Sequence, residues 1–346
     1  MNALIYSFYI LIIILLNTNL LLCSINNISL EKVSFQNQQG ITVPAYISTP
    51  KTLTTTKASY PAVVILHGCS GVFSYSDPTK GIANIYKEWS TKLTDLDYIV
   101  ILVDSFSARA AEQNQCNNGS DGTSEVSERP YDVLAAFDYI TTNSKLEGMI
   151  NPNKVGLMGW SHGGSTTLSS LSTVNYKGEA NKKIFQVGIS FYPGCGLYSN
   201  FGGISTSTWV PNTLLFIFHG SIDPLYTRGY CDTRIKNALA IDSTITLEMN
   251  VYDGAQHSFD DAREVTSKFN DKDVKAKDLA DAVVLYKFNL YLKGPVVFAG
   301  ESTSTPTTTT TTTTNSNSSS SSSESRFQMY TILGYVCVVF SLMILV

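Results

Sequence analysis

A five-residue motif behind a short apolar run places the strongest constraint on the fold of this chain. Residues 155–158 have the pattern of a buried strand, Gly159-Trp160-Ser161-His162-Gly163 follows at once, and residues 164–168 can begin a helix. A strand that turns this sharply into a helix holds the central residue in a strained backbone conformation. Glycines at positions 159 and 163 fit such a turn because a Cβ there would collide with the crossing backbone. The motif therefore predicts that Ser161 presents its hydroxyl at the end of a sheet.

An acid and a base follow the serine in a recognisable order. Residues 214–220 form a strand-like run that leads into Ser221-Ile222-Asp223-Pro224, and a later strand pattern at 245–251 leads into the loop that carries His257. The chain order Ser161, Asp223, His257 is that of the α/β-hydrolases and differs from the chymotrypsin and subtilisin orders. Asp253 lies closer to His257 in sequence, but Asp253-Gly254 has the composition of a turn. We therefore expect Asp223 to be the acid of a catalytic triad.

An oxyanion site is expected on an earlier loop. The strand pattern at 61–66 ends in His67-Gly68-Cys69-Ser70-Gly71, whose backbone offers an N–H, from Cys69, to pair with the N–H of His162. Two fixed donors of this kind stabilise the charge that develops on a carbonyl under attack. His257 would take the proton of the Ser161 hydroxyl, and Asp223 would orient the imidazole. His67 and His219 both precede a glycine at a strand end, and we expect structural roles for them.

At these residues the chain resembles the dienelactone hydrolase family of α/β-hydrolases, over roughly residues 43–292. The resemblance rests on residues 67–71, 103–106, 159–163 and 221–223, and on the ending His257-Ser258-Phe259. It implies an α/β-hydrolase fold and hydrolase activity. The founding enzymes of the family use a cysteine nucleophile, where this chain has Ser161, which indicates ordinary ester chemistry. They also hold a substrate carboxylate with an arginine just after the catalytic histidine, where this chain has Asp260 and Asp261. The resemblance places Arg109 near the other substrate-binding arginine of the family.

Strand and helix patterns alternate through the middle of the chain. Apolar runs at 98–103 and 187–192 predict buried strands, the apolar residues of 129–142 recur near a period of 3.6, and 276–292 predicts a closing helix. This alternation predicts an α/β fold over residues 25–298, with a mostly parallel sheet and helices on both faces. The side chains expected to line a substrate pocket are those of Arg109, Trp160, Phe106 and Phe259.

The two ends of the chain predict secretion and membrane attachment. Residues 1–24 have the apolar core and small residues of a secretory signal peptide, with an uncleaved anchor as the alternative. Residues 299–325 form a threonine- and serine-rich stalk, and 326–346 an apolar segment without charge after Arg326. This layout is typical of a glycosylphosphatidylinositol (GPI) signal with attachment in Ser318–Ser323. A C-terminal transmembrane helix is the alternative.

The cysteines and sequons agree with an extracellular chain. Cys69, Cys116, Cys195 and Cys231 remain after both end segments are removed, and four cysteines allow three pairings. Their positions after predicted strand ends favour Cys195–Cys231 and Cys69–Cys116. N-glycosylation sequons occur at three positions, namely Asn27, Asn118 and Asn317.

Composition narrows the function further. The net charge of −4 comes without clusters of lysine or arginine, which argues against nucleic-acid binding. The four histidines show no metal-ligand spacing with cysteine, and we expect neither a metal nor a cofactor. The sequence therefore predicts a surface-anchored serine hydrolase whose substrates are small carboxylic esters or lactones. A peptidase or acyltransferase that uses the same triad is one alternative, and a catalytically inactive surface recognition protein is another.

Overall fold

The computed structural model describes residues 28–54, 60–74, 79, 81–109, 123–143, 145–197 and 201–294. The chain divides into two compact units, Met1–Val296 and Val297–Val346, and all described residues belong to the first. The predicted signal peptide, stalk, GPI attachment region and C-terminal apolar segment lie outside the described residues, as do Cys116, Asn27, Asn118 and Asn317. None of the helices in the described part is long and apolar enough to cross a membrane.

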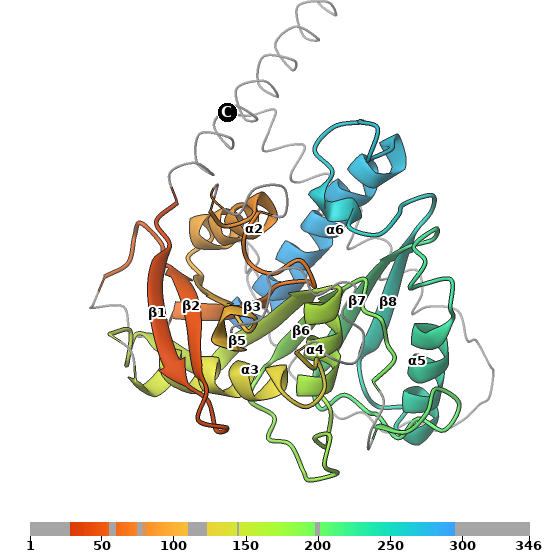
Figure 1. The fold of residues 1–346 in the computed structure, drawn as a ribbon, viewed down its shortest axis with the longest axis horizontal. Helices are drawn as coiled ribbons and strands as arrows, with labels where there is room; N and C mark the ends of the chain where they lie inside the picture. The colour runs from red at the N-terminus through yellow and green to blue at the C-terminus, as the bar shows by residue number, and fades with distance from the viewer. Residues whose placement is uncertain are drawn as a thin grey trace, which may run out of the picture. The chain divides into compact units, whose positions relative to one another are not determined.

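An eight-stranded sheet forms the centre of the first unit (Figure 1). Its spatial order is β1-β2-β4-β3-β5-β6-β7-β8. Strands β1 and β2 pair antiparallel with each other, β2 pairs antiparallel with β4, and all the other pairs are parallel. The strands are β1 (Glu31–Gln36), β2 (Thr42–Ser48), β3 (Tyr60–Leu66), β4 (Ile99–Val103), β5 (Ile150–Trp160), β6 (Val187–Phe191), β7 (Leu214–Gly220) and β8 (Leu247–Tyr252).

Three of the inner strands are buried along their whole length because both faces of the sheet are covered. Every residue of β3, β4 and β6 is buried. Successive side chains point to opposite faces, so Val63 and Ile65 join one core cluster while Val64 and Leu66 join the other. The two clusters lie on the two sides of one sheet.

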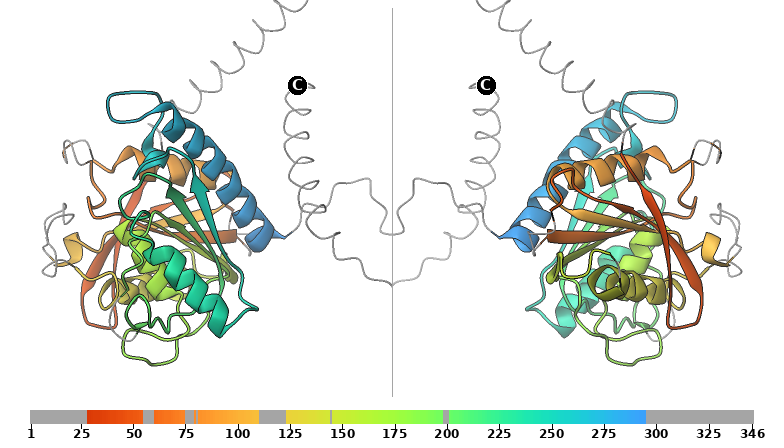
Figure 2. Two further views of the ribbon diagram at one scale, coloured as in Figure 1. Left: turned by 90° about the vertical axis from the view of Figure 1, so that its right-hand side faces the viewer. Right: turned by 90° about the vertical axis from the view of Figure 1, so that its left-hand side faces the viewer.

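Helices cover each face of this sheet (Figure 2). Helices α2 (Asn84–Asp95) and α6 (Asp271–Phe288) pack into one cluster, and α3 (Arg129–Asp138), α4 (His162–Ser170) and α5 (Tyr230–Ile241) into the other. The predicted helix at 129–142 is α3 with a π-helical turn, Tyr139–Asn143. The predicted closing helix begins earlier than expected, at Asp271, because Asn270 and Asp273 form a reciprocal capping box. The expected α/β-hydrolase architecture is confirmed.

The parallel strands bring the predicted site residues to one edge of the sheet. In register, Leu66 of β3 stands beside Gly159 of β5, Trp160 beside Phe191 of β6, and Gly220 of β7 beside Tyr252 of β8. The segments after these strands therefore leave the sheet at the same edge. Ligands of open α/β sheets bind outside this carboxyl edge.

Candidate active site

Ser161 sits at a tight turn between β5 and α4. Its backbone has φ 51° and ψ −112°, which is the strained conformation that the sequence predicts. The N–H of Ser161 donates to the carbonyl of Phe191 at 2.8 Å. Glycine is required beside it because a Cβ on Gly163 would lie 2.4 Å from the carbonyl oxygen of Leu66 and 2.5 Å from that of His67. Close packing against the end of β3 therefore fixes where the serine hydroxyl stands.

Ser161, His257 and Asp223 are brought together as one hydrogen-bonded chain. The Oγ of Ser161 lies 3.2 Å from Nε2 of His257, and Nδ1 of His257 lies 2.8 Å from Oδ2 of Asp223. Asp223 is fully buried, whereas a third of the His257 side chain is exposed. This arrangement lets His257 accept a proton from Ser161 while a carboxylate holds the other ring nitrogen.

The carboxylate of Asp223 is held in its charged form. Burial alone would raise its pKa, but contacts with His219 and His257 lower the pKa below its ordinary value, and the N–H of Leu225 adds to this effect. That N–H donates to Oδ1 at 2.7 Å, and Nδ1 of His219 lies 3.5 Å from Oδ2. A charged Asp223 favours the imidazolium that His257 becomes when it takes a proton.

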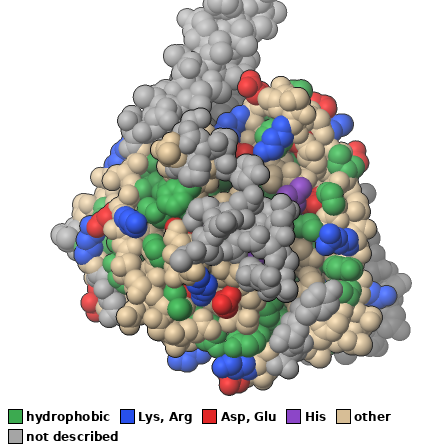
Figure 3. All heavy atoms as spheres, in the orientation of Figure 1, with side chains coloured by type: hydrophobic (Ala, Val, Ile, Leu, Met, Phe, Trp, Pro, Cys, Tyr) green, Lys and Arg blue, Asp and Glu red, His purple; other side chains and the backbone are tan. Residues whose placement is uncertain are grey.

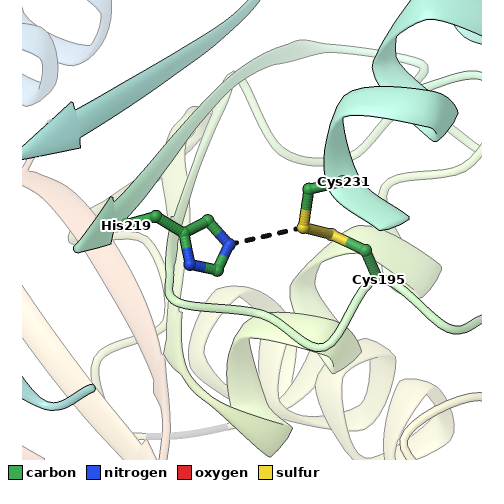
Figure 4. Close-up of side chains that lie close together, drawn as sticks. All are labelled: Cys195, His219 and Cys231. Carbon is green, nitrogen blue, oxygen red and sulfur yellow. Dashed lines mark hydrogen bonds between the residues drawn. A yellow bond between two sulfur atoms is a disulfide. The ribbon is translucent and has the colours of Figure 1, made fainter. Parts of the chain in front are cut away.

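His219, which contacts Asp223, also lies beside a disulfide (Figure 4). Its Nε2 is 3.3 Å from Sγ of Cys231, which is bonded to Cys195 across the start of α5. The three side chains lie close enough to hold a metal, but the two sulfurs are already bonded to each other. Both cysteines and His219 are buried. His219 is therefore packed between Asp223 and the disulfide, and a structural role for it stays a prediction.

Arg129, which no sequence pattern indicates, joins the loop after β3 to His162, the residue after Ser161. Its guanidinium is fully buried and donates to the carbonyl of His67 at 2.9 Å and to Nδ1 of His162 at 2.7 Å. Nε2 of His162 is 3.2 Å from a carboxylate oxygen of Glu125. Burial, together with the charge of Arg129, lowers the pKa of His162. A neutral His162 ring that donates from Nε2 to Glu125 and accepts from Arg129 at Nδ1 satisfies both partners.

The two residues expected to form the oxyanion site both adjoin Ser161, because His162 follows it in the chain and Cys69 lines the same cavity. His162 is the first residue of α4, so its N–H has no acceptor within the helix and belongs to the positive end of the helix dipole. Cys69 lines the cavity beside Ser161 and is disulfide-bonded. Its expected partner, Cys116, lies outside the described residues.

A cavity of about 490 Å³ opens in front of the triad. Ser161 and His257 line it together with two groups of side chains. An apolar and aromatic group includes Phe73, Ala83, Ile85, Tyr86, Trp160 and Tyr192, and a polar group includes Ser70, Ser74, Asn84, Asp261, Arg263 and Lys268. This combination is typical of a small-molecule site, where apolar walls bind the ligand and a few polar groups orient it.

Three of the four expected pocket residues do not line this cavity. Trp160 does, but Phe106 and Phe259 are fully buried core residues, and Phe106 packs edge-on against His67 with ring centroids 4.4 Å apart. The expectation for Arg109 is also wrong. Its guanidinium is bound to the buried carboxylate of Asp132, with contacts of 2.9 and 3.2 Å. Arg109 is thus held by a buried acid and is not among the residues that line the cavity.

Charged side chains of both signs surround the cavity opening. Arg263 contacts Glu88 at 2.6 Å and Asp261 at 2.9 Å, and Lys268 lies 3.9 Å from Asp261. Lys268 is the more exposed of the two cations. On the face drawn in Figure 3, lysine and arginine side chains are likewise interspersed with acidic ones. The opening thus presents cations that are already paired with carboxylates.

Comparison with solved structures shows the same fold in several hydrolases. A dienelactone hydrolase-like promiscuous phosphotriesterase, P91, from metagenomic libraries is 16% identical, with a TM-score of 0.55 over 76% of this chain and 98% of that one. Thermogutta terrifontis esterase 2, phosphorylated by paraoxon, is 16% identical, with a TM-score of 0.50 over 75% and 94% of the two chains. A puromycin-hydrolyzing peptidase of Mycobacterium tuberculosis is 13% identical, with a TM-score of 0.54 over 78% of this chain and 41% of that one.

Sequence comparison supplies the family. No sequence relative was found among curated proteins. The model of the dienelactone hydrolase family, however, matches residues 43–292, which span the sheet from β2 to the end of α6 and include Ser161, Asp223 and His257. With this match over most of its length, and with the fold and site geometry described above, the chain belongs to the dienelactone hydrolase family and is a hydrolase.

Proposed function

We propose that the chain is a serine hydrolase that cleaves carboxylic esters or lactones through Ser161, His257 and Asp223. The observation that carries the proposal is the hydrogen-bond chain from Ser161 Oγ through His257 to the buried Asp223, placed at the cavity wall. A serine hydroxyl is a poor nucleophile at neutral pH, and an imidazole in contact with it removes this obstacle.

The reaction begins when Ser161 Oγ attacks the ester carbonyl carbon and its proton passes to Nε2 of His257. The carbonyl oxygen becomes an oxyanion, which the backbone N–H groups of Cys69 and His162 stabilise. Donors of this kind typically contribute about 10²–10³-fold in kcat each. His257 then returns the proton to the departing alkoxide, leaving an acyl group on Ser161. Water, deprotonated by the same imidazole, releases the acid and restores the serine.

The side chains that line the cavity suit a small, largely uncharged ester. Phe73, Ile85, Tyr86 and Trp160 offer apolar contact to an acyl or alkyl group close to Ser161. Arg263 is already neutralised by Glu88 and Asp261. The position after His257 that carries a carboxylate-binding arginine in the founding family members holds Asp260 here, and this carboxylate is buried. These features favour neutral esters over dienelactones.

Hydrolysis of short-chain p-nitrophenyl esters by residues 25–300 tests the proposal. The Ser161→Ala variant should lose turnover, whereas Ser170→Ala, a matched change at the last residue of α4, should keep it. Loss of activity in both variants would point to a folding defect. Equal and negligible rates in wild type and Ser161→Ala would overturn the ester assignment, and peptide anilides would be the next substrates to test.

We also propose that the enzyme acts at the cell surface, held by a GPI anchor. The signal-like residues 1–24, the stalk 299–325, the small residues Ser318–Ser323 and the apolar segment 326–346 support this proposal. The disulfide between Cys195 and Cys231 agrees with folding in an oxidising compartment. Phosphatidylinositol-specific phospholipase C should release the activity from intact cells. Activity that stays with the membrane after this treatment, and is extracted only by detergent, would favour a transmembrane helix.

A further inference from the structure

The carboxylate of Asp260 lies behind the triad and is used by none of the steps above. Asp260 belongs to a short 3₁₀ turn, Phe259–Asp261, three residues after His257, and it is fully buried. Both of its oxygens accept hydrogen bonds from residues of the active-site wall. Trp160 Nε1 donates to Oδ2 at 2.5 Å, and the Tyr192 hydroxyl donates to Oδ1 at 2.6 Å.

The two donors are the immediate neighbours of the catalytic groups. Trp160 directly precedes Ser161 and lines the cavity. Tyr192 also lines the cavity, and its ring lies against the ring of His257, with centroids 4.5 Å apart. Tyr192 has a φ of 37°, which is unusual for a residue other than glycine. One carboxylate thus connects the end of β5, the ring that supports the base, and the loop that carries the base.

We propose that Asp260 is a positioning residue that, as a carboxylate, fixes the ring of Tyr192 against His257 and so holds the base in line with Ser161. The kinetic part of this inference rests on the proposed function. Protonation of Asp260 removes an acceptor, because a neutral carboxyl must itself donate one hydrogen bond where two donors already point at it. The Tyr192 hydroxyl would then have to turn its hydrogen away and accept from Asp260, and this exchange of a charge-assisted hydrogen bond for a neutral one would loosen the support of His257.

The surroundings of Asp260 put this protonation within reach of ordinary pH. Burial raises its pKa to about 6, while the hydrogen bonds from Tyr192 and Trp160 oppose that rise. The charged and titratable groups that face it from the packed elements are Lys277 and Asp281 of α6, Tyr86 of α2, and Tyr192, whose own pKa burial raises well above the ordinary value. Lys277 and Asp281 act in opposite directions on Asp260, so burial decides the outcome.

The test compares Asp260→Asn, Tyr192→Phe and the double variant with wild type between pH 4.5 and 8.5. Asparagine keeps the shape and can still accept from Trp160, but its NH2 can only donate to the Tyr192 hydroxyl, so the charge-assisted hydrogen bond from Tyr192 is lost. Phenylalanine keeps the ring but removes its hydroxyl. We expect each single variant to lose roughly 10- to 100-fold in kcat with little change in KM, because the base is misplaced while the cavity remains. The double variant should be no worse than the poorer single one. The control Asp253→Asn, an exposed acid on the same connection, should behave as wild type.

Two readouts separate positioning from a general loss of structure. On the acid side, the slope of log(kcat/KM) against pH should exceed one in wild type, since His257 must be neutral and Asp260 ionised. In Asp260→Asn, where only one group titrates, this slope should fall to one. The NMR signal of the Trp160 indole N–H, which donates to Asp260, should also shift with an inflection near pH 6 that disappears in Asp260→Asn, and this second readout needs no turnover. Unchanged kcat in folded variants, or a Trp160 signal that titrates in Asp260→Asn as it does in wild type, would overturn the inference. Absence of wild-type turnover with the inflection present would refute only the proposed function.

Discussion

Replacing Arg129 with methionine should detach the loop after β3 from the residue that follows the nucleophile. The guanidinium is fully buried and holds the His67 carbonyl at 2.9 Å and the His162 ring at 2.7 Å. Methionine retains a stem of similar length that can still pack on the ring of Phe106, which lies 5.4 Å from the guanidinium carbon. The substitution therefore removes the hydrogen bonds while it keeps most of the packing.

The expected effect on stability follows from those two contacts. A hydrogen bond from a charged donor contributes about 1.5–3 kcal/mol to the free energy of unfolding, and an orphaned buried acceptor costs a similar amount. Part of this loss is offset because a buried guanidinium no longer has to be desolvated. We expect Arg129→Met to lower the free energy of unfolding by about 3 kcal/mol. A typical domain has about 5–15 kcal/mol, so the variant should remain folded at low temperature.

Urea unfolding and ester hydrolysis, measured on the same preparations, check this prediction. The value of kcat/KM should fall roughly 10- to 100-fold under conditions where the variant is folded, because the two sides of the proposed oxyanion site lose their common tie. Arg228→Met is the matched control, since Arg228 is exposed on the loop after β7. A variant with wild-type stability and wild-type kcat/KM would refute the reasoning.

Three further changes have distinct expected outcomes. Asp223→Asn should reduce kcat by about 10⁴-fold, measured with the same esters under conditions where the variant is folded, and a modest effect would show that another group orients His257. Glu88 has its pKa lowered to about 2 because Lys92 and Lys277 outweigh its burial. Its charge therefore stabilises the fold above pH 4.5 and ceases to do so as the pH falls towards 2. Urea unfolding should show that Glu88→Gln lowers the free energy of unfolding at pH 7 and lowers it much less at pH 2.5. A loss of stability that is independent of pH would contradict this assignment. Replacing Cys195 and Cys231 with alanine opens a loop with a sequence separation of 36 and should lower the free energy of unfolding by about 4 kcal/mol. The shift in the urea midpoint measures this loss, and an unchanged midpoint would show that the bridge adds nothing to stability.

The parts that the sequence predicted well are those that depend on short local patterns. Ser161 was found because a strand, a glycine-flanked turn and a helix follow one another within fifteen residues, and the strained φ of 51° is the direct result. Asp223 and His257 were found because each comes just after a strand, and parallel strands deliver such residues to one edge. The disulfide between Cys195 and Cys231 followed from the same topology, and the structure contains it.

The parts that were missed or misassigned depend on contacts between distant segments. Arg129 meets His162 and His67 across 33 and 62 residues, and nothing in its local sequence distinguishes it from a surface arginine at a helix start. Arg109 was assigned to the pocket by analogy, whereas Asp132, 23 residues away, binds its guanidinium. Phe106 and Phe259 show that an aromatic residue beside a motif carries no information on which side of the wall it faces.

The close approach at Gly163 also determines which parts of the site can adapt to different ligands. With no room for even one methyl group between the start of α4 and the end of β3, these two segments cannot move closer together around Ser161. We therefore expect shape changes that admit larger or smaller acyl groups to come from the other lining residues, among which Lys268 is exposed. Among relatives with this tight turn between β5 and α4, the sequence differences that change substrate range should accordingly lie in the segment after His257 rather than around Ser161.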